Sequence, residues 1–315
     1  MSVLVISEHD SSRLSPSTLS VVNAACQLNT DVFLLVIGSD CHSVILQARE
    51  IDNVSSVLWC EQNDADLASI EDISLFIINL HYTYSFSHLM VAATSFGKDL
   101  MPRVSALLDV VQLSDIIEII SQDTYVRMIY SGNVLLTVKS IDPVKVITVC
   151  TSVFSDATGC NNTANVVQVT GLAISNHSTL IRDELNKSTK RDLSNAKCVI
   201  AVGKGIGGGE NLANIENIAN NIGATLGATR SAVEQGYLSN KFQIGQTGVK
   251  IAPELYLSLG VSGAIQHVAG ISHSKKIVAV NIDENALIFQ FADYGLIADI
   301  NEVIPELTRA FVLND

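Results

Sequence analysis

Charged side chains are scarce in this chain of 315 residues: 19 Lys and Arg and 32 Asp and Glu make up 16% of it, whereas 48% is apolar. A typical soluble domain has about 25% charged residues. Intrinsic disorder is excluded, because it requires low hydrophobicity together with a high charge density. The net charge of −13 and the lack of a basic stripe argue against a nucleic-acid binder.

Long apolar runs are also missing. No run reaches the about 20 residues of a membrane helix, and the longest, Ile73–Leu80 and Val144–Val149, have the length of strands. At the N-terminus a predicted strand, Ser2–Ile6, starts at once and acidic residues follow it, so we expect no signal or transit peptide in the chain as it stands. We expect a bacterial cytoplasmic location, or the mitochondrial matrix only if a transit peptide has been removed.

Cysteines are few and scattered, with no CxxC pair and no histidine at zinc-ligand spacing. This distribution is typical of reduced thiols in a cytosolic compartment, so we expect neither a structural disulfide nor a metal site. The six are Cys26, Cys41, Cys60, Cys150, Cys160 and Cys198.

The length and the uneven charge indicate two domains. At about 100–200 residues a domain, the chain has room for two. Residues 1–185 carry 8 basic and 20 acidic side chains, a balance of 8 − 20 = −12, whereas residues 186–315 carry 11 and 12, a balance of −1. We place the boundary in a polar stretch, with an N-terminal α/β domain over residues 1–187 and a second domain over residues 188–315.

Buried-strand patterns alternate with helical patterns in both domains, which predicts mainly parallel sheets flanked by helices, the α/β class. In the second domain, Ala252–Tyr256 is predicted to open a helix, because Pro253 suits a first turn. In the first domain, the strands predicted at Tyr125–Tyr130, Val134–Lys139 and Lys145–Val149 are expected to form hairpins at the edge of the sheet. The other predicted helices are Pro16–Leu28, Glu210–Ile222 and Val303–Leu313, and the strands are Val3–Ile6, Asp31–Ile37, Ser55–Cys60, Leu75–Leu80, Tyr125–Tyr130, Val134–Lys139, Lys145–Val149, Lys197–Val202, Lys276–Asn281 and Leu287–Phe291.

A glycine-rich loop follows the first strand of the second domain. Gly203, Gly205 and Gly208 match the spacing G-x-G-x-x-G, in which backbone amides approach a pyrophosphate. The acidic residue that an NAD site needs about 20 positions later is absent, and Thr229 and Arg230 stand near that place. Because an arginine suits a 2′-phosphate, an NADP-dependent oxidoreductase stays open on these residues alone.

The loops that follow bear hydroxyls, amides, one histidine and one arginine. They read IGQTG at residues 244–248, GVSGAIQH at residues 260–267 and ADYGLIADI at residues 292–300. Such groups bind the edge of a heterocycle and a diphosphate, and they include no nucleophile–base pair and no metal-ligand cluster.

These runs, with GATRSAVEQGY, IGQTGVKIAPELY and GVSGAIQHVAG, resemble the FAD-binding domain of electron transfer flavoprotein alpha subunits. The runs SVLVISEH and PRVSALLDVVQLSDI extend the resemblance over nearly the whole chain. It implies a Rossmann-like second domain that binds FAD in extended form and a heterodimer with a beta subunit contacted by the N-terminal domain. It also implies an electron carrier between dehydrogenases, such as acyl-CoA dehydrogenases of fatty acid beta-oxidation, and a membrane quinone oxidoreductase. On this view the chain is an electron transfer protein rather than a substrate-converting enzyme, and it contacts no nucleic acid and is not embedded in a membrane.

The resemblance also assigns the cofactor contacts residue by residue. Arg230 is implied to lie beside the flavin ring, where a guanidinium stabilises the charge of the reduced flavin, and His267 is implied to lie near the pyrimidine end. Asp299 has a second interpretation as a helix cap, and Thr247 as a turn cap. The implied set is Lys204, Thr229, Arg230, Ile244, Gly245, Gln246, Thr247, Ser262, Gly263, Ala264, Ile265, Gln266, His267, Asn281, Asp299 and Ile300.

Lys204 departs from the family pattern, which usually has arginine at this position. A lysine keeps the positive charge but loses the planar fork of the guanidinium. Three alternatives also stay open at this point: the NADP-dependent oxidoreductase, a non-catalytic nucleotide sensor, and a variant specialised for nitrogen fixation or electron bifurcation.

Overall fold

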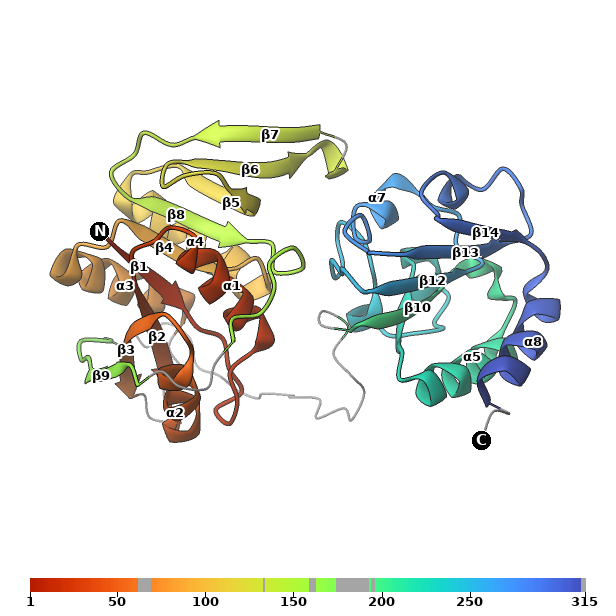
Figure 1. Cartoon of the computed structure of the whole chain (residues 1–315), viewed down its shortest axis with the longest axis horizontal. Helices are drawn as coiled ribbons and strands as arrows, with labels where there is room; N and C mark the ends of the chain where they lie inside the picture. The colour runs from red at the N-terminus through yellow and green to blue at the C-terminus, as the bar shows by residue number, and fades with distance from the viewer. Residues whose placement is uncertain (62–68, 133, 159–162, 174–192, 194–195, 313–315) are drawn as a thin grey trace. The chain divides into compact units, whose positions relative to one another are not determined.

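Two mainly parallel sheets organise the chain in the computed structural model, which describes residues 1–61, 69–132, 134–158, 163–173, 193 and 196–312 (Figure 1). The chain divides into one unit made of Met1–Ile129 and Asn133–Leu185 and a second made mainly of Asn186–Asp315. The predicted α/β class with parallel sheets is confirmed. The predicted boundary between residues 187 and 188 lies outside the described residues and stays a prediction.

The sheet of the first unit has nine strands in the order β7-β6-β5-β8-β4-β1-β2-β3-β9. The central strands are parallel and buried on both faces, as their continuous apolar runs predict. Their bounds are β1 Ser2–Ile6, β2 Asp31–Gly38, β3 Val54–Glu61, β4 His88–Ala92, β5 Gln112–Ile119, β6 Thr124–Ile129, β7 Val134–Lys139, β8 Lys145–Val149 and β9 Asn165–Gln168.

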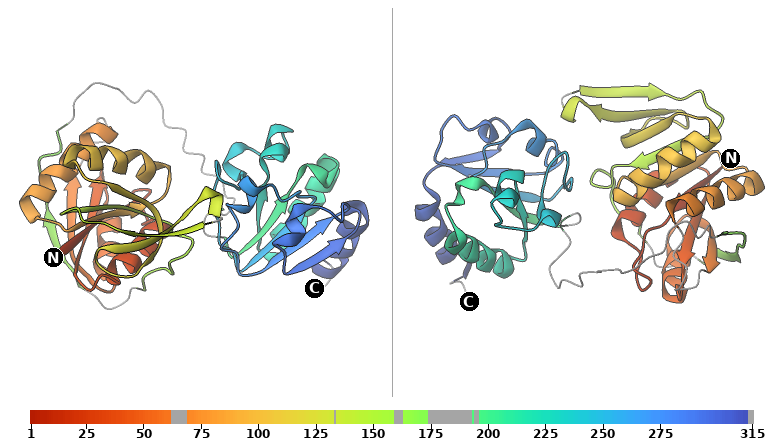
Figure 2. Two further views of the ribbon diagram at one scale, coloured as in Figure 1. Left: turned by 90° about the horizontal axis from the view of Figure 1, so that it is seen from above. Right: turned by 180° about the vertical axis from the view of Figure 1, so that it is seen from behind.

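Helices cover both faces of this sheet. Apolar residues of α1 (Pro16–Cys26) and α2 (His42–Glu50) pack on one face, and those of α3 (Ile70–Tyr84) and α4 (Ser95–Leu108) pack on the other. Figure 2 shows this layering from two further directions. Two separate apolar cores therefore sandwich the sheet.

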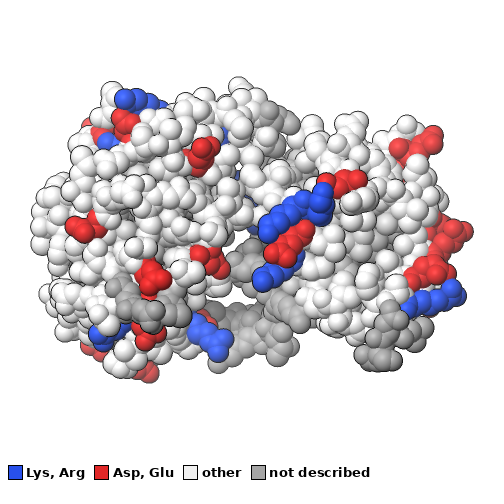
Figure 3. All heavy atoms as spheres, viewed as in Figure 1, with Lys and Arg blue, Asp and Glu red and all other residues white. Residues whose placement is uncertain are grey.

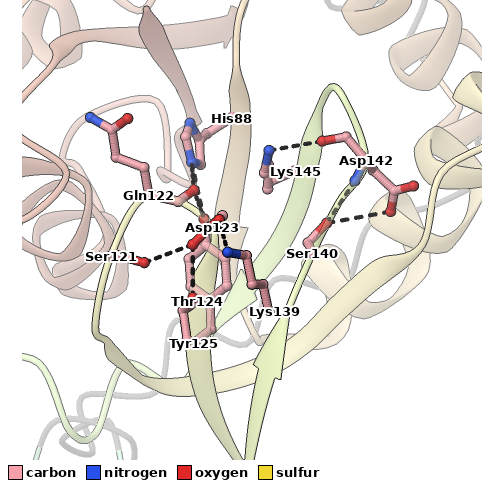
Figure 4. Close-up of polar contacts among 10 residues, drawn as sticks. All are labelled: His88, Ser121, Gln122, Asp123, Thr124, Tyr125, Lys139, Ser140, Asp142 and Lys145. Atoms are coloured by element: carbon pink, nitrogen blue, oxygen red, sulfur yellow. Dashed lines mark hydrogen bonds and ion pairs between the residues drawn. The ribbon is translucent and has the colours of Figure 1, made fainter.

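Two predictions for the first unit were wrong in part. The predicted strand Leu75–Leu80 lies inside α3, where a capping box of Ser69 and Asp72 starts the helix. The pattern of a short apolar run does not distinguish a strand from a buried helix. The predicted edge hairpin is confirmed for β6 and β7, but β8, the third strand predicted there, pairs in parallel between β4 and β5, and the partner of β6 on its other side is β5, which was not predicted as a strand. Figure 4 shows residues of the turn between β5 and β6 and of the connection between β7 and β8.

The second unit has five parallel strands in the order β11-β10-β12-β13-β14. Numbered within the unit, this is the doubly wound order 2-1-3-4-5, whose direction reverses between its first and third strands, β10 and β12. The strands are β10 Cys198–Val202, β11 Thr225–Ala228, β12 Leu255–Leu259, β13 Ile277–Asn281 and β14 Tyr294–Ile297.

Helices α5 (Gly209–Ile222) and α8 (Ile300–Val312) lie side by side over one face of this sheet (Figure 1). The short helices are α6 (Arg230–Glu234) and α7 (Ile265–Val268), with 3-10 turns η1 (Tyr130–Gly132), η2 (Lys204–Ile206), η3 (Asn240–Phe242) and η4 (Leu287–Gln290). The opposite face is covered by loops whose apolar residues form a further core.

Two predictions for this unit were wrong. Residues 252–256 do not open a helix, because Leu255 and Tyr256 begin β12, which pairs on both sides with β10 and β13. Residues 287–291 form the turn η4 instead of a strand. Residues 255–259 form a strand because neighbouring strands pair with them, and no strand pairing is found for residues 287–291 in the part of the chain that the structure describes. Strand formation thus depends on these distant partners more than on the local pattern.

The distribution of charged, apolar and metal-binding side chains in the structure can be compared with the composition of the sequence. On the face drawn in Figure 3, acidic and basic side chains occur in small separate groups among uncharged atoms. Within the described ranges, no helix is long and apolar enough to cross a membrane, and no group of His, Cys, Asp and Glu is placed to hold a metal. The five cysteines that the structure describes form no disulfide with one another, and Cys160 lies outside the described residues.

Candidate functional site

A pocket of about 740 Å³ lies at the carboxyl ends of the strands of the second unit. It is formed by the loops that follow β10, β11, β12 and β13, and so includes the point where the strand order reverses. Open α/β sheets bind ligands in this position, and the volume suits a small molecule or cofactor. Its wall is formed by Gly203, Lys204, Gly205, Thr229, Arg230, Ser231, Gln243, Ile244, Gly245, Gln246, Thr247, Gly260, Val261, Ser262, Gly263, Ala264, Gln266, His267, Asn281, Asp283 and Ala286.

The glycine-rich loop is packed against the loop that follows β12. The Gly203 amide donates to the Leu259 carbonyl at 2.9 Å, and the Gly205 amide donates to the Gly260 carbonyl at 3.2 Å. A Cβ on Gly203 would meet the carbonyl oxygen of Gly260 at 2.0 Å, so a side chain has no room. Glycine is therefore required at position 203 for the close approach of the two loops. The neighbouring Lys204 is exposed on the pocket wall.

Thr229 and Arg230 lie where β11 passes into α6. The Thr229 hydroxyl caps this helix by accepting from the amide of Ala232 at 3.3 Å. The Arg230 side chain is 72% exposed, and its Nε donates to the Glu234 carboxylate at 2.8 Å. An exposed ion pair is weak, so the guanidinium is free to turn toward a bound anion at small cost.

The loop after η3 is fastened to α7. The Gln246 amide donates to the Gln266 carbonyl at 2.7 Å, and Gly245, with a φ of +144°, leaves no room for a Cβ, which would lie 2.9 Å from the same oxygen. The Thr247 hydroxyl accepts from the side-chain amide of the buried Gln243 at 2.9 Å. These contacts present Gln246 and Thr247 at the pocket wall.

The loop after β12 turns at Gly263, whose φ is +83°. The Ile288 amide donates to the Ser262 carbonyl at 3.1 Å. On the far side of the same loop, the Asn281 side-chain amide donates to the Val261 carbonyl at 2.8 Å. The loop that carries Ser262, Gly263 and Ala264 is thereby held on two sides.

His267 lies on the pocket wall but is 6% exposed. Its Nε2 is 2.6 Å from the Tyr256 hydroxyl, and its Nδ1 is 3.1 Å from the Ile244 carbonyl. Burial lowers the pKa of His267 to about 4, and the Ile244 carbonyl only partly opposes this effect. The ring is therefore neutral at pH near 7, so it adds no full positive charge to the site.

Three residues of the implied set do not line the pocket. The side chain of Ile265 is 50% exposed, and Ile300 is buried in the core beneath α8. Asp299 accepts from the Asn301 amide at 2.8 Å at the start of α8, which matches its second interpretation as a helix cap. The remaining members of the set all lie on the pocket wall.

Other lining residues lie outside the set that the resemblance implies. Gly203 and Gly205 belong to the glycine-rich loop, so that motif already carried the signal. Gln243 and Asp283 follow no pattern that marks a site, and only the fold brings them to the wall.

The residues present fit an extended dinucleotide such as FAD. Two glycines at positive φ, Gly245 and Gly263, shape loops that approach without side chains, and Lys204 and Arg230 supply positive charge for a diphosphate and a ring. The wall has hydroxyl and amide groups for hydrogen bonds but no nucleophile–base pair among the residues that the structure describes there. A bound FAD would supply redox chemistry, and these residues would supply its orientation and the charge around it.

Comparison with known proteins gives matches over nearly the whole chain. Residues 192–272 match the family model described as electron transfer flavoprotein FAD-binding domain, and residues 3–173 match electron transfer flavoprotein domain. The chain is 43% identical to electron transfer flavoprotein subunit alpha of Pseudomonas aeruginosa, covering 98% of this chain and 100% of that one. It is 44% identical to the Bradyrhizobium diazoefficiens subunit, covering 98% of each. The mitochondrial subunit of Dictyostelium discoideum is 39% identical, with 98% of this chain and 90% of that one covered.

Proposed function

This chain belongs to the family of electron transfer flavoprotein alpha subunits and carries that family's FAD-binding domain, and from this membership we propose a specific role for it. The chain pairs with an electron transfer flavoprotein beta subunit, accepts electrons from dehydrogenases and passes them to a membrane quinone oxidoreductase. Acyl-CoA dehydrogenases of fatty acid beta-oxidation are the proposed donors. The observation that supports this role is the pocket at the strand-order reversal, where nearly all the residues implied by the resemblance converge.

FAD, when bound, supplies reversible one- and two-electron redox chemistry. We propose that the residues of the second unit hold it in parts. Lys204 and the loop 262–266 would hold the diphosphate and ribityl chain, and Gln246 and Thr247 the edge of the flavin. Asn281 would lie at the adenosine half.

Arg230 and His267 would have different effects on the flavin. The Arg230 guanidinium is always charged and stabilises negative charge on a reduced ring. The neutral His267 contributes no such charge and acts through its place in the wall. The Lys204 ammonium would act as a point charge in place of a bidentate guanidinium contact.

The two-domain division, with a boundary at residues 187 and 188 and beta-subunit contact through the N-terminal domain, is part of this proposal. A bacterial cytoplasmic location also stays a prediction, since the relatives include both bacterial and mitochondrial proteins.

Co-expression with a beta subunit tests the proposal. We expect a yellow heterodimer, identified by its mass, whose flavin is reduced when an acyl-CoA dehydrogenase and its substrate are added. A heterodimer that binds FAD but takes no electrons from the dehydrogenase would contradict the proposed donors. A colourless protein that binds NADPH would support the NADP-dependent alternative instead.

A further inference from the structure

A chain of three buried polar groups connects the pocket wall, which Ile244 and His267 line, to Tyr256 on the central sheet. The Tyr256 hydroxyl on β12 meets Nε2 of His267 on α7 at 2.6 Å, and Nδ1 of His267 meets the Ile244 carbonyl at 3.1 Å. Tyr256 is fully buried, and Ile244 is 2% exposed. The three groups therefore connect the central sheet, a helix and a loop of the site.

The partners fix where the protons lie. A carbonyl oxygen only accepts hydrogen bonds, so Nδ1 of His267 carries the proton toward Ile244. In a neutral ring, Nε2 is then an acceptor, and the Tyr256 hydroxyl donates to it. A buried hydroxyl and a buried imidazole satisfy one another in this arrangement, and leaving either without a partner would be costly.

This connection adds to the contacts that hold residues 244–247, where the Ile244 amide also donates to the Ala228 carbonyl at 2.9 Å and the Gly245 amide donates to the Val249 carbonyl at 3.2 Å. Residues 244–247 contact α7 through the Gln246 amide, which donates to the Gln266 carbonyl at 2.7 Å, and through the close approach of Gly245 to the same residue. The His267 side chain adds a further hydrogen bond between the same two segments. Tyr256 itself does not line the pocket, so any effect it has on a ligand passes through His267.

We propose that Tyr256 is a positioning residue of the FAD site: by donating to Nε2, its hydroxyl holds His267 in the Nδ1–H tautomer that the Ile244 carbonyl accepts from, and so holds the wall formed by residues 244–247 against α7. This inference rests on the proposed FAD site, but the tautomer itself exists without FAD. Tyr256→Phe removes one hydroxyl and keeps the buried ring in place.

The first unit supplies a matched control. Tyr125 is 1% exposed, and its hydroxyl donates to the Gln122 carbonyl at 2.7 Å and lies 3.0 Å from Nε2 of the buried His88. Figure 4 shows these three residues together. Tyr125→Phe therefore disrupts a similar buried tyrosine–histidine pair in the other unit.

The first measurement needs no variant of Tyr256. The chain is labelled with nitrogen-15 histidine, assembled with an unlabelled beta subunit, and studied by proton–nitrogen correlation spectra at pH near 7, with His267→Gln used to assign the ring. We expect a neutral ring with its proton on Nδ1, with or without FAD. A proton on Nε2 alone, or a charged ring, overturns the proposal whatever FAD does.

The second measurement is FAD affinity. We expect Tyr256→Phe to raise the FAD dissociation constant about fivefold, the equivalent of one net hydrogen bond, and to change the His267 ring signals. Tyr125→Phe should leave both unchanged even where it lowers thermal stability. If the folded Tyr256→Phe protein has the same FAD affinity and the same His267 ring signals as the parent, the proposal is overturned. If that variant does not fold, the tautomer measured in the parent tests the proposal instead. A parent heterodimer that binds no FAD would refute the proposed function without touching the tautomer result.

Discussion

Gly263→Ala should destabilise the second unit far more than an alanine at another left-handed glycine. Gly263 has a φ of +83°, and a Cβ there would lie 2.2 Å from the backbone nitrogen of Ile288. The left-handed conformation alone costs an alanine about 1–2 kcal/mol. The backbone of Ile288 must also move away, which breaks the bond from its amide to the Ser262 carbonyl and adds about 1 kcal/mol. We therefore expect a loss of about 2–3 kcal/mol in the free energy of unfolding.

Gly207→Ala is the matched control. Gly207 has a φ of +77°, but the nearest atom to its Cβ is the Asn211 side chain at 3.9 Å, so only the conformational cost of about 1–2 kcal/mol applies. Urea titration of the FAD-loaded heterodimer, followed by circular dichroism, measures both losses. With a slope of about 2 kcal/mol per molar urea, the Gly263→Ala midpoint should fall by about 1–1.5 M. If Gly263→Ala lowers the midpoint no more than Gly207→Ala, the close approach of the two loops is wrong.

Three further predictions concern charge, pH and a helix cap. Arg230→Ala should weaken FAD retention and lower the reduction potential of the bound flavin, because a positive charge near the reduced ring is lost; Arg230→Lys should restore part of the potential, and a redox titration equal to the parent's would refute the role. His267 has a folded pKa of about 4 against about 6.5 when unfolded, so its contribution to stability is complete above pH 6.5 and is lost as the pH falls. Between pH of about 7 and 5 the parent should lose about 2 kcal/mol more than His267→Gln, and equal losses would contradict the buried neutral ring. Ser69→Ala should cost about 1 kcal/mol by removing the cap of α3, whereas Ser69→Thr should cost less in the same urea titration.

Much of the architecture is predictable from local patterns. Buried strands such as β1 and β2 are continuous apolar runs, and a parallel sheet covered by helices is what such runs indicate. The local pattern fails where a contact distant in sequence decides. Residues 255–259 form a strand because neighbouring strands lie on both sides, and nothing in the residues before them shows that these neighbours exist.

The site is predictable to a similar degree. The motif runs locate the loops that follow β10, β11 and β12, because parallel strands bring their carboxyl ends to one edge. They do not reveal that Ile265 points away, that Ile300 is buried, or that Asp283 lines the pocket. The pairing of Tyr256 with His267 is also invisible in the sequence, since it depends on how β12 packs beneath α7.

Hydrogen–deuterium exchange of the purified heterodimer, with FAD bound and after FAD is stripped, tests the central claim most directly. The central claim is that FAD binds in the pocket at the strand-order reversal of the second unit. We predict that FAD slows exchange in residues 203–206, 244–249 and 260–267 and leaves the strands β1 and β2 of the first unit unchanged. FAD-dependent protection confined to other segments, with these three unaffected, would contradict the account.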